Sequence, residues 1–109
     1  IDFTIRKFFE IPASGSLLAC WPTTNFKQLG FKDGINSIAL SNVSDVLEVT
    51  HAVSKNPEKY QLIASEGQRM VMDKHSLLAR SKQLRNSFER IIENSFKGTY
   101  WEEGEFKYV

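Results

Sequence analysis

The chain has 109 residues, enough for one domain and too few for two. Hydrophobic residues make up 41% of it and charged residues 25%, as in ordinary globular domains, which argues against disorder. Its 14 basic and 13 acidic side chains leave a formal charge of +1, so the composition favours neither a nucleic-acid partner nor a polybasic membrane surface. The longest stretch without charge, residues 11–26, contains prolines, a glycine and hydroxyl side chains, so no transmembrane segment is predicted.

The only cysteine is Cys20, so an intrachain disulfide cannot form, and a reducing, cytoplasmic location is the simplest expectation. The first residues contain no methionine and no basic region ahead of an apolar stretch, so they lack the pattern of a signal peptide. They read instead as a start inside a longer protein, and we expect the chain to be a fragment of one.

The first part of the chain predicts one helix and two short strands. Apolar residues at helical spacing predict a helix over residues 3–11, which Pro12 ends or kinks, and Gly15 then offers the positive φ of a helix stop. Residues 16–21 are an apolar run without alternation, typical of a strand buried on both faces. A second strand is predicted over residues 35–40, and the connection of more than ten residues favours parallel pairing.

Three helices are predicted next. Ser44 is the expected N-cap of the first, because acidic residues follow it in the first turn. Asn56–Pro57–Glu58 combines a cap, a proline at the first helical position and an acid, which indicates the start of the second. The third is expected from Ser76 to about Asn94. The inner face of the second helix is predicted to consist of Tyr60, Ile63, Ala64, Gly67, Met70 and Val71.

Together these elements predict an α/β fold, a partial Rossmann-like domain with a small parallel sheet and C-terminal helices, over residues 1–95. The tail, residues 96–109, contains five of the thirteen aromatic residues, and we expect it to be an arm that folds back over the rest of the chain. Two strands alone make a poor sheet. We therefore expect further strands elsewhere in the protein, or a homodimer through the exposed sheet or the aromatic tail.

The familiar motifs of catalytic and metal sites are absent from the sequence. His51 and His75 lie far apart, and each is interpreted as a surface or capping residue rather than a metal ligand. Cys20 is interpreted as a core residue, because a reactive thiol needs an electropositive, partly open site. The sequence therefore predicts neither a metal nor a cofactor.

One segment stands apart, because it places a basic pair and a glutamate on a helix ahead of a small-residue turn and an apolar strand. It reads Lys7-x-Phe9-Glu10-Ile11-Pro12-Ala13-Ser14-Gly15. This segment resembles the donor-binding motif in the C-terminal domain of GT-B glycosyltransferases, most of all the glycosyltransferase group 1 members that include spore-maturation-like proteins. Members often read Arg-x-Phe-Glu and then Ala-x-Gly, so this sequence departs from them in having lysine at the first position.

The resemblance continues downstream in short, ordered pieces. Residues 30–36 are similar to the family's Gly-x-x-Asp-Gly-x-Asn loop, and Ser44–Leu47 resembles its next helix start. Asn56–Glu58 and His75–Ser76 keep the order of its closing helices. The resemblance covers about residues 7–92, and the ordered series is more specific than any single piece.

The resemblance implies a site for the donor nucleotide in this segment. Glu10 would accept hydrogen bonds from the ribose hydroxyls, since a carboxylate offers two acceptor oxygens to two vicinal donors. Backbone N–H groups at Ala13, Ser14 and Gly15 would face the pyrophosphate, which only small side chains permit. A plain alternative stays open, in which Glu10 is a solvated helix residue and Gly15 only a helix stop.

Three further charged residues enter through the same resemblance. Arg6 or Lys7 would neutralise diphosphate charge, although a basic pair is usually just a solvated face. Asp2 and Glu10 are separated by seven residues, as are two acids in many retaining members, so Asp2 is a candidate for contact with the sugar. The first of those acids is usually glutamate, and the residues between match poorly. Retention or inversion of the anomeric configuration therefore stays open.

The resemblance thus implies the C-terminal, donor-binding part of a nucleotide-sugar-dependent glycosyltransferase, which transfers the sugar to an unknown acceptor. Its partners would be the nucleotide-sugar donor and an N-terminal domain of the same protein, which would supply the acceptor pocket and any catalytic base. The chain alone should then be inactive as a transferase.

Two other interpretations stay open. The chain could be a non-catalytic α/β interaction module, which would have no reason to bind a nucleoside diphosphate. It could also be another nucleotide-using Rossmann-like enzyme, although no Gly-x-Gly-x-x-Gly follows a predicted strand, which argues against a dinucleotide cofactor.

Overall fold

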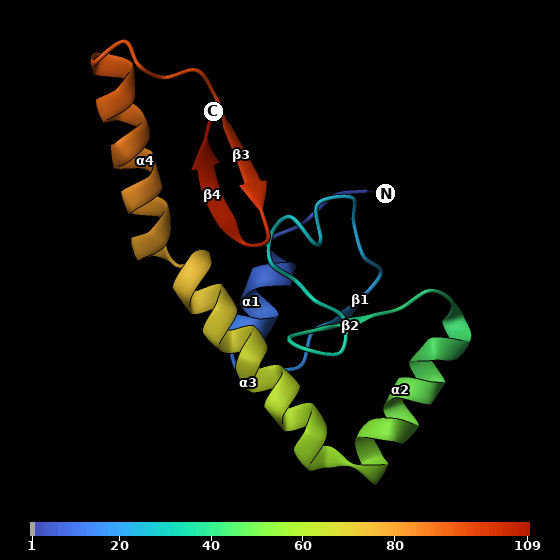
Figure 1. Ribbon diagram of the computed structural model, residues 1–109. Coiled ribbons are helices and arrows are strands. Elements are labelled where there is room, and N and C mark those ends of the chain that lie inside the picture. The colour runs from blue at the N-terminus through green and yellow to red at the C-terminus, as the bar shows by residue number, and fades with distance from the viewer. Residues whose placement is uncertain (1) are drawn as a thin grey trace.

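The computed structural model describes residues 2–109 as an elongated α/β body measuring 55 × 25 × 18 Å (Figure 1). Helices α3 and α4 follow one another along its length, with α1 packed against α3 (Figure 1). The predicted fold class, a partial Rossmann-like α/β domain with a small parallel sheet and C-terminal helices, is confirmed. The elements in chain order are α1 (Lys7–Ala13), β1 (Ala19–Cys20), β2 (Ile38–Ala39), α2 (Val43–Lys55), α3 (Pro57–Lys74), α4 (Leu77–Ile92), β3 (Thr99–Glu102) and β4 (Glu105–Tyr108).

Strands β1 and β2 pair in parallel, as predicted. The amide of Ile38 donates to the carbonyl of Leu18 and that of Leu40 to the carbonyl of Cys20, both at 2.8 Å. Each strand is only two residues long, shorter than the six predicted from the apolar runs. The second strand starts late because the amides of residues 35 and 36 donate to the carbonyl of Lys32 and close a turn there.

The two outer edges of this sheet differ. On the outer side of β2, the Asp33 carboxylate accepts a hydrogen bond from the amide of Ala39 at 2.8 Å, and Asp45 accepts one from the amide of Ser41 at 2.6 Å. On β1, Ala19 is exposed. The prediction that the first strand is buried on both faces is therefore wrong. Leu18 and Cys20 are buried in the core. Ala19, which lies between them, and Trp21, which follows Cys20, are exposed to solvent.

Helix α1 begins at Lys7, four residues later than predicted. The residues before it are instead tied to the loop after β1, where Thr4 and Thr23 share a hydroxyl–hydroxyl hydrogen bond of 2.7 Å. Pro12 lies in the last turn and the helix ends one residue later, close to the predicted stop. Gly15 has a φ of 83°, the left-handed conformation expected of a helix stop.

The N-cap of α2 is Asn42, so the prediction of Ser44 is wrong. Asn42 has extended backbone, and its side-chain oxygen accepts from the amide of Asp45 at 3.1 Å, while Asp45 accepts from the amide of Asn42 at 3.1 Å. This reciprocal capping box satisfies two N–H groups that the helix itself leaves free. Ser44 lies inside the first turn, where its hydroxyl donates to the side chain of Asn42.

The starts of α3 and α4 agree with the prediction. Asn56 caps α3 ahead of Pro57, and Ser76 caps α4. The buried residues of α3 all belong to its predicted inner face: Ile63, Ala64, Gly67 and Val71. A Cβ at Gly67 would lie 2.5 Å from the carbonyl oxygen of Asn36, so only glycine permits this close approach of helix and loop. Of the helices between residues 2 and 109, none is long and apolar enough to cross a membrane.

The core lies between α1, α3 and the loop that joins the two parallel strands. Phe31, which is fully buried, is its centre, and the rings of Phe8, Phe9 and Phe26 lie 5.4–6.2 Å from it. The buried core cluster consists of Leu18, Cys20, Phe26, Leu29, Phe31 and Val71.

The aromatic tail forms an antiparallel hairpin of β3 and β4, which lies alongside α4 (Figure 1). Glu103 and Gly104 both have positive φ, as a two-residue hairpin turn of this kind requires. The amide of Gly104 donates to the carbonyl of Gln28 at 2.8 Å, which ties the hairpin turn to the loop after β1. Of its aromatic side chains, Trp101, Phe106 and Tyr108 are half-buried, whereas Phe96 and Tyr100 are exposed.

Candidate functional site

The predicted carboxylate Glu10 lies on the exposed surface of α1, between two basic side chains. The Nε of Arg6 lies 2.7 Å from its Oε1, and the Nζ of Lys7 lies 3.8 Å from its Oε2. We call these three residues the α1 charge cluster. Exposed pairs of this kind are worth at most about 1 kcal/mol each, so a ligand could rearrange them at little cost. The cluster thus combines one double acceptor with two cations on a single helical turn.

The small-residue turn after α1 is closed by its own backbone. The amides of Ser14, Gly15 and Ser16 donate to the carbonyls of Glu10, Pro12 and Ile11, at 3.0, 2.8 and 3.2 Å. The Ser14 hydroxyl donates to the carbonyl of Ile11 at 2.7 Å. A ligand at this turn would therefore meet the Glu10 carboxylate and small side chains rather than unpaired N–H groups.

Gln68 of α3 also reaches this turn, which the sequence did not indicate. Its side-chain amide donates to the carbonyl of Ala13 at 3.1 Å, across 55 residues of sequence. A Cβ added at Gly15 would lie 3.5 Å from the same amide nitrogen, which is ordinary contact. Gln68 thus fixes the position of the turn against α3, and it has no local motif by which it could be recognised.

Asp2 is bonded at the other end of α1. Its carboxylate accepts from the amide of Thr24 at 2.7 Å and also from the Thr24 hydroxyl. The hydroxyl bond, followed by the amide bond, lowers the pKa of Asp2 below its ordinary value, because both favour the charged form. The carboxylate is thereby held against the loop that follows β1.

The predicted residues are divided between the two ends of the sheet. Ala13, Ser14 and Gly15 lead into the amino end of β1, whereas Asp2 meets the loop beyond its carboxyl end. Ligands of open parallel sheets bind outside the carboxyl ends of the strands. Asp2 is therefore nearer to the usual ligand position than the turn is.

A second cluster, which sequence reasoning missed, surrounds His75. His75 was predicted to be a surface or capping residue. It is the C-cap of α3, and its side chain is buried. Its Nε2 lies 2.7 Å from the carbonyl of Leu29, and its Nδ1 lies 2.7 Å from Nη2 of Arg80. A guanidinium can only donate, so Nδ1 accepts and the proton of the neutral ring lies on Nε2.

Aromatic rings enclose this histidine. The ring centroids of Phe9 and Trp101 lie 4.8 and 5.0 Å from that of His75, and the guanidinium of Arg80 lies 4.8 Å from the Trp101 ring. We call Phe9, Phe31, His75, Arg80 and Trp101 the His75 junction. Burial, together with the charges of Arg80 and Lys74, lowers the pKa of His75 below its ordinary value of 6.5. The junction joins α1, α3, α4 and the hairpin through one neutral imidazole.

Three of the cavities lie away from the α1 charge cluster, and two of them are lined in part by Phe31 and Trp101 of the His75 junction. One of about 360 Å³ lies between α4 and the hairpin. Two others, of about 440 and 250 Å³, adjoin at Lys27 and Glu103. The larger of these has a mainly apolar lining, which consists of Pro22, Phe26, Lys27, Phe31, Lys32, Asp33, Ala39 and Glu103. All predicted site residues lie outside these three linings.

Cys20 is a core residue, as predicted. Burial, and to a lesser extent the nearby charge of Asp33, raises the pKa of its thiol to about 11. The thiol is therefore protonated at neutral pH and is a poor nucleophile.

The fold is that of a partial Rossmann-like α/β domain. Its helix α1 carries an exposed cluster of one acid and two bases, and it leads through a small-residue turn into a parallel strand. The chain belongs to the glycosyl transferase-like family, whose model matches residues 2–86, more than three quarters of its length. The match includes the α1 charge cluster and Asp2 and ends within α4, before the hairpin. Neither the comparison with curated proteins nor the comparison with solved structures gives a significant match.

Proposed function

We propose that this chain binds the nucleotide diphosphate part of a sugar donor and so forms the donor side of a glycosyltransferase active site. The observation that carries the proposal is the position of Glu10 within a segment matched by the glycosyl transferase-like family. Its carboxylate is on the surface, next to two cations, and among residues 2–109 it has no buried partner that would compete for it.

In the proposed reaction this chain has two tasks: it binds the donor nucleotide, and it supplies positive charge near the diphosphate. Glu10 accepts hydrogen bonds from two vicinal ribose hydroxyls, and Arg6 and Lys7 lie one turn away, where they attract the diphosphate. In the transfer, the bond from the anomeric carbon to the diphosphate oxygen breaks, and its electron pair leaves with the diphosphate. The acceptor oxygen forms the new bond and loses its proton to a base. Cations near the departing diphosphate stabilise the charge that develops there.

The finer assignments belong to the same proposal. The protein would be a GT-B enzyme of the spore-maturation-like group that acts in the cytoplasm, with this chain in its C-terminal domain. An N-terminal domain would supply the acceptor pocket and the base. Asp2, held by Thr24 beyond the carboxyl end of β1, would face the sugar, and the small side chains of Ala13, Ser14 and Gly15 would leave room for phosphate.

Calorimetric titration with UDP, GDP and ADP tests the proposal on the chain as it is. We expect one of the three to bind weakly, and Glu10→Gln to weaken it by a factor of ten or more, since charge-assisted hydrogen bonds are worth about 1.5–3 kcal/mol. Glu66→Gln is the matched control. Glu66 is also paired with an arginine on an exposed helix, and its side chain is 46% exposed, against 44% for Glu10. Equal affinity of wild type and Glu10→Gln, or no binding at all, would refute the donor role.

A further inference from the structure

The two cavities that adjoin at Lys27 and Glu103 lie at the carboxyl ends of the parallel strands. Pro22 follows β1 and Ala39 ends β2, and both line the larger cavity. Ligands of open parallel sheets bind outside these strand ends. The smaller cavity is lined in part by the hairpin, which lies beyond residues 2–86 and so outside the family match. We call the two cavities together the strand-end site.

The larger cavity can hold a flat apolar ring. Two of its lining residues, Phe26 and Phe31, are 5 and 0% exposed, so they form its closed end. Pro22 and Ala39 add apolar surface, and the volume of about 440 Å³ is typical of a small-molecule site. An aromatic ring placed there removes a large apolar area from water. The lining therefore favours a ligand that contains such a ring.

Charged groups of both signs surround the same cavity. Lys27, Lys32 and Asp33 are exposed residues of the loop after β1, and Glu103 lies in the hairpin turn. These two cations and two carboxylates leave no net charge, and in the described part of the chain none of them forms an ion pair. Asp33 is partly occupied, because its carboxylate accepts from the amide of Ala39 at 2.8 Å. The cavity therefore offers donors and acceptors to an uncharged ligand, as the edge of a nucleobase requires.

The smaller cavity, of about 250 Å³, suits a sugar. Tyr100 and Trp101 supply aromatic surface, against which the C–H face of a sugar ring can pack. Gln28 and Glu102 also line it, and an amide and a carboxylate can both bond to sugar hydroxyl groups. The Oε2 of Glu102 forms an ion pair with Lys107, which leaves Oε1 for a ligand.

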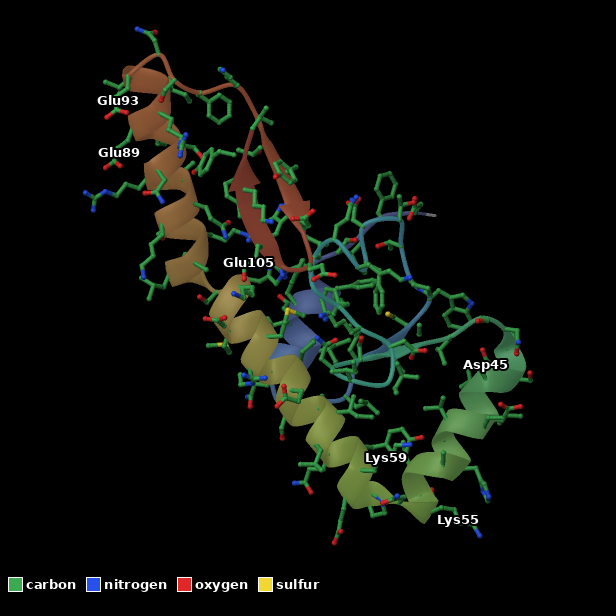
Figure 2. The ribbon with its side chains drawn as sticks, in the orientation of Figure 1. Asp45, Lys55, Lys59, Glu89, Glu93 and Glu105 are labelled. Carbon is green, nitrogen blue, oxygen red and sulfur yellow. The ribbon has the colours of Figure 1, made fainter. Side chains whose placement is uncertain are left out.

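Two contacts hold the hairpin turn next to this site. The amide of Gly104 donates to the carbonyl of Gln28 at 2.8 Å. Glu105 forms an ion pair with Lys74 of α3, and Figure 2 shows Glu105 where the hairpin approaches the ends of α3 and α4. Glu103 is therefore kept beside the loop after β1, and the site is formed before any ligand binds.

We propose that the strand-end site binds an uncharged nucleoside, with the base in the larger cavity and the ribose in the smaller one. Lys27 and Glu103 lie where the two cavities meet and bond to the ligand there. Glu102 and Glu103 repel a phosphate group, so a nucleoside binds in preference to a nucleotide. The proposal goes beyond the donor role of the α1 charge cluster, which requires a diphosphate, and does not depend on it.

NMR titration of the whole chain with adenosine, guanosine, uridine and cytidine tests the proposal. We expect at least one of them to bind and to shift the amide signals of Ala39 and Trp101, while those of the Ala13–Gly15 turn stay unchanged. Its 5′-monophosphate should bind here several-fold more weakly, and Glu10→Gln should leave the nucleoside affinity unchanged. Absence of binding, loss of binding in Glu10→Gln or equal affinity for the monophosphate would overturn the proposal.

Substitution of the two residues shared by both cavities locates the ligand. Lys27→Ala combined with Glu103→Gln changes only exposed side chains, and we expect the nucleoside affinity to fall about tenfold. Lys82→Ala combined with Glu93→Gln is the control, because these exposed residues line other cavities. It should bind as the wild type does, and circular dichroism should show the same helix content in all three proteins. Unchanged affinity in the first variant would overturn the proposal.

Discussion

The α1 charge cluster and the His75 junction are held in place in different ways. The cluster consists of three exposed side chains that pair within one helical turn. The junction joins residues from four elements around a buried ring, and its bond from His75 to Leu29 spans 46 residues of sequence. A surface cluster of this kind can serve binding without supporting the fold, whereas the junction packs around a buried imidazole and supports the fold. Substitutions in the core, in the junction and in the cluster should separate these two roles.

Removing the ring at the centre of the core should have the largest effect. Phe31→Ala deletes a fully buried ring that packs against three other phenylalanines and His75. We expect a loss of about 3–5 kcal/mol in the free energy of unfolding, measured by urea denaturation. Phe3→Ala, at a side chain that is 73% exposed, should change it by less than about 0.5 kcal/mol. Similar losses in both variants would contradict the assignment of the core.

A smaller effect is expected where α3 contacts the loop before β2. In Gly67→Ala the new Cβ would lie 2.5 Å from the carbonyl oxygen of Asn36, so helix and loop must separate. We expect a loss of about 1–3 kcal/mol in the free energy of unfolding, despite the better helix propensity of alanine. Ser65→Ala, on the exposed side of the same helix, is the control and should be neutral or slightly stabilising. If Gly67→Ala left the free energy of unfolding unchanged, α3 and the loop at Asn36 would not be in close contact.

The His75 junction should make stability depend on pH. Because the pKa of His75 is lower in the folded protein than its ordinary value of 6.5, the unfolded chain takes up the proton more readily. The stabilisation is therefore complete above about pH 6.5 and is lost as the pH falls through the folded pKa. Protonation would also place an N–H of the ring against the guanidinium of Arg80.

Urea midpoints measured between pH 8 and pH 5 check this dependence. In His75→Gln, an amide can keep both hydrogen bonds but does not titrate, so its profile should be flatter than that of the wild type over this range. Parallel profiles for the two proteins would show that His75 does not contribute to the acid sensitivity.

The smallest effect on stability is expected in the α1 charge cluster. Glu10→Gln breaks only exposed pairs, so we expect the free energy of unfolding to change by less than about 0.5 kcal/mol. Thermal denaturation of the same preparation that is used for nucleotide titration measures it. A large destabilisation would mean that Glu10 has a structural role. Any loss of nucleotide binding in Glu10→Gln would then reflect unfolding rather than the loss of a ligand contact.

Local signals in the sequence predicted the helix starts well. Asn56–Pro57 and Ser76 act within one turn, so their effect can be read from neighbouring residues. At α2 the predicted cap, Ser44, lies two residues beyond the observed one, because the reciprocal bonds of Asn42 and Asp45 make Asn42 the N-cap. The strand lengths were overestimated because pairing, rather than apolar composition, determines where a strand begins and ends.

Long-range contacts explain most of what the sequence did not indicate. The position of His75 depends on Leu29, Arg80 and Trp101, which are distant in sequence or on other elements. The hairpin has a local signal in Glu103–Gly104, where both residues take positive φ, but only an arm was predicted for the tail. For the candidate site, the motif predicted which side chains carry charge. It could not predict that the amides of the turn donate to α1 or that Gln68 covers the turn.

The two edges of the parallel sheet differ in whether a further strand can pair with them. On the β2 side, the N–H groups of Ala39 and Ser41 are already occupied by carboxylates, whose charge also repels the carbonyls of an approaching strand. On the β1 side, Ala19 stands open to solvent. Any strand that extends this sheet, whatever its origin, is therefore directed to β1, and β2 is the terminal strand of the sheet.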